Sequence, residues 1–221
     1  MDRTAVLIDG GYFKKRMMAE LGRKSPSELA ELVSEISRQH VSAEPNSSLY
    51  RIFYYDCAPV QKKLHKPISK IAVELGNTPQ ARFAIDLHNE LLKVRKVALR
   101  LGELVLNPRE PWVLRDYVQK KLILGEIHYG DLTDNAFRLN VGQKGVDMRI
   151  GLDIASLAFK RQVTQIVLIS GDSDFVPAAK LARREGLDVV LDPLGAHVND
   201  LLNEHVDGLI RTKPTFSLTT N

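Results

Sequence analysis

The chain has 221 residues, 44% hydrophobic and 26% charged, which suits one large domain or one domain with an insertion. The 31 Lys and Arg residues exceed the 27 Asp and Glu residues only slightly, so the net charge of +4 permits a polyanionic partner without requiring one. The longest apolar runs are too short for a membrane span, and the single cysteine, Cys57, excludes an internal disulfide and a cysteine-based zinc site. Because residues 1–9 resemble a strand and not a signal peptide, we expect a cytoplasmic protein with no membrane partner.

In the first half of the chain, short apolar runs alternate with stretches of helical periodicity. We expect strands in the runs rich in β-branched, aliphatic and aromatic residues, at 4–9, 49–56 and 93–106, the last with a break at Gly102. We expect helices where apolar residues recur every three or four positions, at 12–22, from Pro26 onward, at 60–76 and at 78–92.

The second half begins with a mixed segment, 107–135, that is rich in Pro and Gly. We interpret residues 1–213 as a single domain with an elaboration at about 60–135, and residues 214–221 as a frayed tail. After this segment, strand-like and helix-like stretches alternate again. We expect strands at 137–141, 165–170, 187–191 and 209–210 and helices at 146–159, 175–184 and 197–204. Alternating strands and helices predict an α/β fold, a three-layer sandwich whose mainly parallel central sheet is covered by helices.

Carboxylates follow two of the expected strands directly. Asp9 ends the first strand, and Asp172 and Asp174 follow the buried strand 165–170. Open α/β sheets place their chemistry at the carboxyl ends of parallel strands, so these groups are candidate metal ligands. Each also has a structural alternative, because Asp9 could serve only a turn, and Asp172, Ser173 and Asp174 could cap the next helix.

A third acidic element is Gln143-Lys-Gly-Val-Asp147, which leads into the helix containing Asp153. Six residues turn a helix by about 600°, so the two aspartates lie about 120° apart and cannot both point into one small site. Asp147 is therefore the better ligand. Asp153 could instead pair with Arg149 four residues away, or support the site from behind.

These stretches together resemble a known family. Val6-Leu-Ile-Asp-Gly-Gly-Tyr-Phe13, Phe53-Tyr-Tyr-Asp-Cys-Ala-Pro59, Gln143-Lys-Gly-Val-Asp147 and Ile169-Ser-Gly-Asp-Ser-Asp-Phe-Val-Pro177 are similar to the successive motifs of NYN domains. NYN domains are PIN-like nucleases, and the resemblance is greatest to their bacterial DUF88 or LabA-like branch. One departure is the Gly11-Tyr12 pair, where many members have Asn shortly after the first Asp-Gly.

The resemblance implies a PIN-like Rossmannoid sheet and hydrolysis of RNA with Mg²⁺ or Mn²⁺, the hard ions that prefer oxygen ligands. We expect an endoribonuclease, with single-stranded RNA as the favoured substrate because its backbone and splayed bases can enter a cleft without duplex opening. A homo-oligomer is compatible with the sequence. Carried over by position, the catalytic and metal-binding set is Asp9, Asp147, Asp172 and Asp174. The secondary candidates are Asp153, Ser170, Ser173, Lys144 and Asp56.

Two other functions stay open from the sequence. The same fold could act as an RNA- or protein-binding regulatory module with little turnover, or as a metal-dependent small-molecule phosphohydrolase. The basic runs at 14–16, 61–66, 93–96 and 160–161 are equally ambiguous, since each could be a solvated surface or part of a positive rim around the acidic site.

Overall fold

The computed structural model describes residues 2–44 and 46–212, so the predicted frayed tail, 214–221, lies outside the described residues. The chain divides into two compact units. Unit 1 comprises Met1–Asp56, Asp86–Gly102 and Gly145–Asn221, and unit 2 comprises Cys57–Ile85 and Glu103–Lys144.

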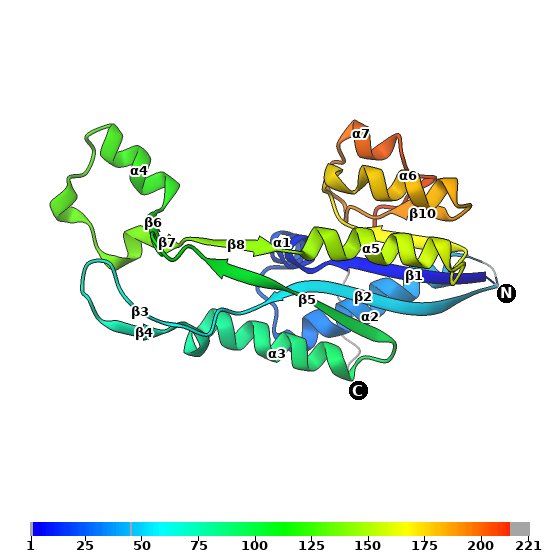
Figure 1. The fold of residues 1–221 in the computed structure, drawn as a ribbon, viewed down its shortest axis with the longest axis horizontal. Coiled ribbons are helices and arrows are strands. Elements are labelled where there is room, and N and C mark those ends of the chain that lie inside the picture. The colour runs from blue at the N-terminus through cyan, green and yellow to red at the C-terminus, as the bar shows by residue number, and fades with distance from the viewer. Residues whose placement is uncertain (1, 45, 213–221) are drawn as a thin grey trace. The chain divides into compact units, whose positions relative to one another are not determined.

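Unit 1 is built on a parallel sheet (Figure 1). Strand β1 (Asp2–Asp9) lies at its centre and pairs in parallel with β2 (Ser47–Ala58) and β9 (Gln165–Ile169). Strand β9 pairs in parallel with β10 (Asp188–Leu191), and β10 with β11 (Gly208–Leu209). With β5 (Val97–Leu106) beside β2, the order is β11-β10-β9-β1-β2-β5, which confirms the predicted mainly parallel α/β fold.

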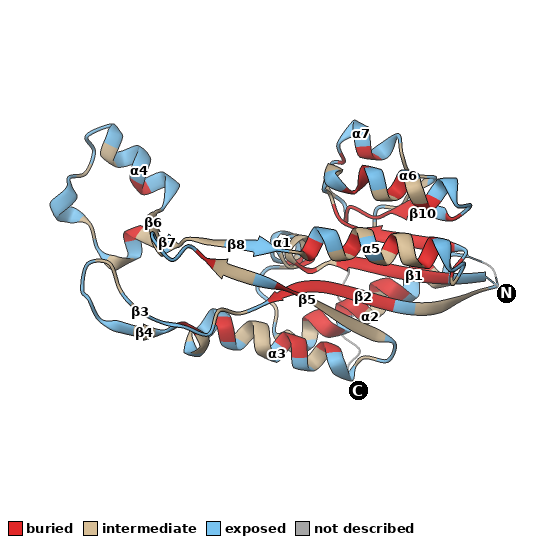
Figure 2. Ribbon diagram, viewed as in Figure 1, coloured by how far each residue is buried: buried red, intermediate tan, exposed pale blue. Residues whose placement is uncertain are grey.

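Helices cover both faces of this sheet, with α5 and α6 on one side of the strands and α2 on the other (Figure 1). Strand β9 is consequently buried along its whole length, and β1 is buried from Thr4 to Ile8 (Figure 2). The local sequence explains where helices begin: Ser25 and Glu28 form a reciprocal capping box around Pro26, the first residue of α2. The helices of unit 1 are α1 (Gly10–Leu21), α2 (Pro26–Ser42), α5 (Val146–Phe159), α6 (Val176–Arg184) and α7 (Asp200–Asn203).

Helix α3 (Pro79–Lys93) begins in unit 2 and ends in unit 1. Unit 2 otherwise consists of short elements, with β8 antiparallel to the end of β5 and two small hairpins, β3-β4 and β6-β7. No helix among the described residues is long and apolar enough to cross a membrane. The elements of unit 2 are β3 (Lys63–His65), β4 (Ala72–Glu74), β6 (Trp112–Leu114), α4 (Asp116–Ile123), β7 (Phe137–Leu139) and β8 (Val141–Lys144).

Two sequence predictions in this region are wrong. Residues 60–76 do not form a helix but the β3-β4 hairpin, followed by a single 3₁₀ turn at Leu75–Asn77. Pro67 lies in the middle of the predicted helix, where it removes a backbone donor and disfavours helical dihedrals at the preceding residue. The expected break at Gly102 is also absent, because β5 runs without interruption through that glycine.

Candidate functional site

Asp9 is the last residue of β1 and the N-cap of α1. Its Oδ1 accepts a hydrogen bond from the backbone N–H of Tyr12 at 3.0 Å. The turn is tight, since a Cβ on Gly10 would lie 2.5 Å from the carbonyl oxygen of Tyr55. The structural role that the sequence allowed for Asp9 is therefore present, and it holds the carboxylate at the end of the strand.

Asp172 and Asp174 follow β9, the neighbour of β1. Ile8 pairs with Ile169 in the sheet, so the two strands end side by side. The N–H of Asp172 donates to Ser170 Oγ at 3.2 Å, and the N–H of Asp174 donates to Asp172 Oδ1 at 2.9 Å. Asp172 thus caps the 3₁₀ turn Ser173–Phe175 with one oxygen. The helix that follows, α6, begins after Phe175 and has no side-chain cap, so none of the three residues caps that helix as the alternative proposed.

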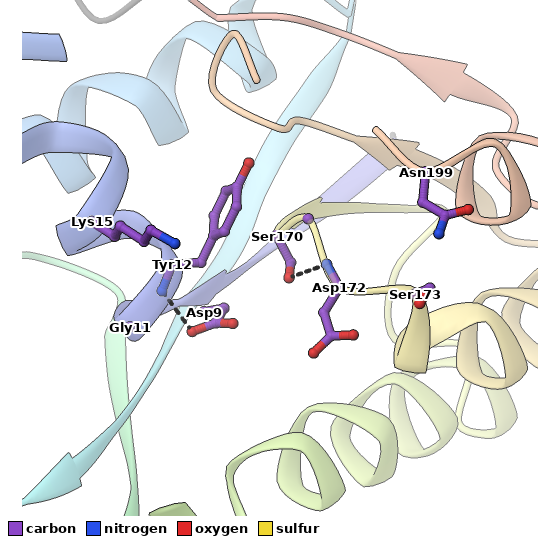
Figure 3. A pocket seen from close by; sticks show the side chains of 9 residues that line it. Asp9, Gly11, Tyr12, Lys15, Ser170, Asp172, Ser173 and Asn199 are labelled. Atoms are coloured by element: carbon purple, nitrogen blue, oxygen red, sulfur yellow. Dashed lines mark hydrogen bonds between the residues drawn. The ribbon is translucent and has the colours of Figure 1, made fainter. Parts of the chain in front are cut away.

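A pocket of about 420 Å³ opens at these strand ends. Figure 3 shows the side chains of Asp9, at the end of β1, and Asp172, in the loop after β9, with Lys15 and Asn199 on opposite sides of them. Sequence reasoning did not single out Lys15 within its basic run and gave no signal for Asn199. The pocket is lined by Asp9, Gly11, Tyr12, Lys15, Ser170, Gly171, Asp172, Ser173 and Asn199.

Tyr12 forms one wall of the pocket. Its hydroxyl donates to the carbonyl oxygen of Pro193 at 2.6 Å, which fixes the direction of the ring. The ring lies against Gly171, where an added Cβ would be 2.8 Å from Cε2 of the tyrosine. Only a glycine at position 171 therefore allows this position of the ring.

Asp147 is the fourth predicted aspartate, and its charge acts on Asp9. It lies in the first turn of α5, after Gly145, whose φ of 78° is left-handed. Burial raises the pKa of Asp9, backbone N–H groups of Tyr12 and Gly11 lower it, and the charges of Asp147 and Asp172 raise it further. Burial also raises the pKa of Asp147, followed by the charges of Asp172 and Asp174. The charges of Asp147 and Asp172 thus act on Asp9, and those of Asp172 and Asp174 act on Asp147.

No Lys or Arg in the described part of the chain forms an ion pair with any member of this group. Close like charges disfavour full ionisation, so the group favours either protons or a bound cation.

The secondary candidates behave differently from one another. Asp153 accepts hydrogen bonds from Tyr55 Oη at 2.9 Å and from Arg100 Nε at 3.0 Å. The predicted pair with Arg149 is wrong, because the Arg149 guanidinium donates to the carbonyl oxygen of Gly145. Asp153 is therefore held by side chains of β2 and β5 and does not line the pocket.

Asp56, at the end of β2, is also engaged elsewhere. It is buried, and its Oδ2 accepts from Lys14 Nζ at 2.6 Å and lies 3.2 Å from His88 Nε2. Lys144 is the exposed last residue of β8 in unit 2. Ser170 and Ser173 line the pocket, as expected from their position beside Asp172.

The donor set suits a hard divalent cation. Within residues 2–44 and 46–212, no three His, Cys, Asp or Glu side chains are gathered closely enough to hold a metal ion. Mg²⁺ does not require such a cluster, since it keeps several waters and is usually bound by one or two carboxylates together with substrate phosphates. Asp9 and Asp172, which share one pocket, meet that requirement.

The family comparison agrees with the motifs. The NYN domain model matches residues 113–208, somewhat less than half of the chain, and includes Asp147, Asp172 and Asp174 but not Asp9. Residues 113–208 are thus similar to NYN domains. The DUF88 or LabA-like branch stays a prediction.

Individual relatives are distant. An uncharacterized protein of Methanocaldococcus jannaschii is 25% identical over 164 residues, which are 74% of this chain and 62% of that protein. A crystal structure of a protein of unknown function from Vibrio parahaemolyticus is 15% identical, with 95% of this chain and 91% of that chain covered and a TM-score of 0.49. A sirtuin, Sir2Tm bound to a propionylated peptide, is 13% identical with a TM-score of 0.34, covering 95% of this chain and 87% of that chain.

Proposed function

We propose that the protein is a metal-dependent endoribonuclease that hydrolyses phosphodiester bonds of single-stranded RNA. The observation that supports this most is the position of Asp9 and Asp172, at the ends of two adjacent parallel strands and in one open pocket. The raised pKa values of Asp9 and Asp147 add to it, because carboxylates whose ionisation is disfavoured by burial and by neighbouring carboxylates are what a divalent cation would stabilise.

Asp9 and Asp172 would hold Mg²⁺ or Mn²⁺ together with waters and a substrate phosphate, and Asp147 and Asp174 would orient the attacking water. Such an ion, when bound, lowers the pKa of a water and stabilises charge on the phosphate and leaving oxygens. The backbone N–H of Tyr12 and the α1 cap keep Asp9 fixed, and Lys15 lines the pocket where a phosphate would enter. Single strands are favoured because their backbone and unstacked bases can reach a pocket without duplex opening.

The test compares wild type with Asp172→Asn on a labelled single-stranded RNA in Mn²⁺, Mg²⁺ or EDTA. Asparagine can still accept the hydrogen bond from the N–H of Asp174, so the variant should fold normally. Asp86→Asn is the matched control, because Asp86 is an exposed aspartate on α3 that does not line the pocket.

We expect metal-dependent cleavage by wild type and Asp86→Asn, and its loss in Asp172→Asn. RNA that stays intact with every ion but is bound by the protein would contradict the proposal and favour the regulatory module. Turnover of nucleotides without cleavage of oligonucleotides would instead favour the phosphohydrolase.

A further inference from the structure

The net positive charge of the chain lies in one of its two units. Unit 2 holds 11 of the 31 Lys and Arg residues but only 7 of the 27 Asp and Glu residues. The whole net charge of +4 therefore lies in unit 2, and unit 1, which contains the acidic pocket, is neutral. This net charge favours binding of a phosphodiester chain to unit 2, whereas unit 1 offers such a chain no net charge.

Most of this excess lies in the β3-β4 hairpin. Residues 62–74, here called the basic hairpin, contain four lysines and one acidic residue, Glu74. Lys63 Nζ lies 3.7 Å from Glu74, but both side chains are more than half exposed, and such a surface pair neutralises little in water. The lysines are Lys62, Lys63, Lys66 and Lys70, of which Lys62, Lys63 and Lys70 are exposed.

The tip of the basic hairpin is held in one conformation by other parts of unit 2. Asp134 Oδ1 accepts from the N–H groups of Ile68 at 3.0 Å and Ser69 at 3.2 Å. At the base of the tip, Trp112 Nε1 donates to the carbonyl oxygen of His65 at 2.9 Å. A loop that is ordered before binding loses less conformational entropy when a ligand docks on it.

The same tip exposes apolar side chains beside its lysines. Ile68 is 47% exposed and Ile71 is 60% exposed, although the tip that carries them is tied down on both sides. Figure 2 colours most of this hairpin as exposed. Lysines around an apolar surface suit a strand that offers phosphates together with the apolar faces of its bases.

We propose that the basic hairpin is a binding site for the sugar-phosphate backbone of single-stranded RNA, separate from the acidic pocket. The proposal rests on the proposed function in taking RNA as the substrate. It makes unit 2 the part of the chain that captures a long substrate, and it assigns Lys62, Lys63 and Lys70 to phosphates and Ile68 to a base or ribose.

The test measures RNA binding with the full chain. The variant Lys62→Gln/Lys63→Gln/Lys70→Gln keeps side-chain length and removes three charges, and Lys160→Gln/Lys180→Gln/Arg184→Gln removes three exposed charges from unit 1 as a matched control. Both are placed in the Asp172→Asn background in EDTA, so that binding is measured without cleavage. Affinity for a 20-nucleotide RNA is determined by fluorescence anisotropy across a salt series, with thermal unfolding as the check on folding.

We expect the hairpin variant to bind at least about tenfold more weakly at low salt. The logarithm of the association constant decreases with the logarithm of the salt concentration, and the magnitude of this slope should be smaller by about 2 in the variant. Each lost phosphate contact on a single strand lowers the magnitude of the slope by roughly 0.7, and the variant loses three lysines. The unit 1 control should keep at least half of the wild-type affinity. Ile68→Ser should weaken binding with little change in slope, because it removes an apolar contact and no charge.

Unchanged affinity and slope in the hairpin variant would overturn the proposal, and so would hairpin-dependent binding to vesicles of phosphatidylserine without binding to RNA. The two proposals can fail separately. If wild type cleaves RNA and the hairpin variant binds RNA normally, only this inference fails. If RNA binding depends on the hairpin but wild type cleaves nothing with any ion, only the proposed function fails.

Discussion

The ring of Tyr12 lies across Gly171, so close that a Cβ on the glycine would be 2.8 Å from Cε2 and 3.2 Å from Cζ. The tyrosine cannot simply turn away, because its hydroxyl is bound to the carbonyl oxygen of Pro193. This contact joins α1, the loop after β9 and the loop after β10 at one wall of the pocket. Its disruption should change the position of Asp9 and Asp172 relative to each other.

Gly171→Ala should therefore reduce the proposed cleavage more than it reduces stability. We expect kcat/KM to fall by roughly tenfold or more, since small displacements of reacting groups are costly, while the melting temperature changes by only a few degrees. Gly151→Ala is the control, because nothing lies within 4 Å of a Cβ at that position in α5. It should stabilise the protein by about 0.5–1 kcal/mol and leave cleavage unchanged. Equal activity of the two variants would contradict the role given to Tyr12.

Asp9→Asn should stabilise the metal-free protein at neutral pH. The pKa of Asp9 is raised on folding, chiefly by burial, so the folded chain holds this proton more tightly than the unfolded chain. The resulting stability is present below the unfolded pKa and is lost as the pH rises through the folded pKa. Asparagine keeps the cap on α1 and cannot ionise, so its stability should not show this loss.

Urea unfolding in EDTA between pH 4 and pH 7 measures the effect. Wild type should lose stability relative to Asp9→Asn as the pH rises, and Mg²⁺ or Mn²⁺ should restore stability to wild type only. A variant that is less stable than wild type at pH 7 without metal would contradict this account.

The sequence predicts unit 1 well because its elements are long and strongly patterned. Continuous apolar runs such as residues 165–170 indicate parallel strands, and carboxylates at their ends indicate where the pocket opens. Prediction from the sequence fails where short elements, such as the β3-β4 hairpin, depend on contacts with residues far away in the chain. The tip of the basic hairpin is stabilised by Asp134, about 65 residues later in the chain, and such a contact has no local pattern. Arg100 likewise replaces the nearby Arg149 as the partner of Asp153.

Gly10→Ala should destabilise the fold strongly. An added Cβ would lie 2.5 Å from the carbonyl oxygen of Tyr55 and 2.6 Å from Cε1 of the buried Tyr54. Backbone of a central strand cannot move aside easily, so we expect a loss of about 1–3 kcal/mol in the free energy of unfolding, measured in urea. A loss no larger than that of an exposed surface substitution would show that α1 can shift without cost.

Asp192→Ala should be the most destabilising of these changes. Asp192 is fully buried at the end of β10, with Oδ2 2.8 Å from His40 Nε2 and Oδ1 accepting from the N–H of Leu194 at 2.8 Å. Removing one partner of a buried pair leaves the other polar group without compensation, which costs about 3–5 kcal/mol. Asp188→Ala, at the exposed start of the same strand, is the control and should cost about 1 kcal/mol in the same urea titration. Similar losses for the two variants would contradict the structural role of the His40 pair.

Asp153→Asn separates support of the fold from participation in the site. Asp153 is bound by Arg100 and Tyr55 and does not line the pocket, so its replacement should cost stability and not cleavage. Because the Arg100 side chain is 42% exposed, we expect the pair to contribute no more than about 1 kcal/mol. A double-mutant cycle with Arg100→Gln, followed by urea unfolding, measures that coupling directly. Cleavage by Asp153→Asn should stay within about threefold of wild type, whereas a loss comparable to that of Asp172→Asn would place Asp153 in the catalytic group after all.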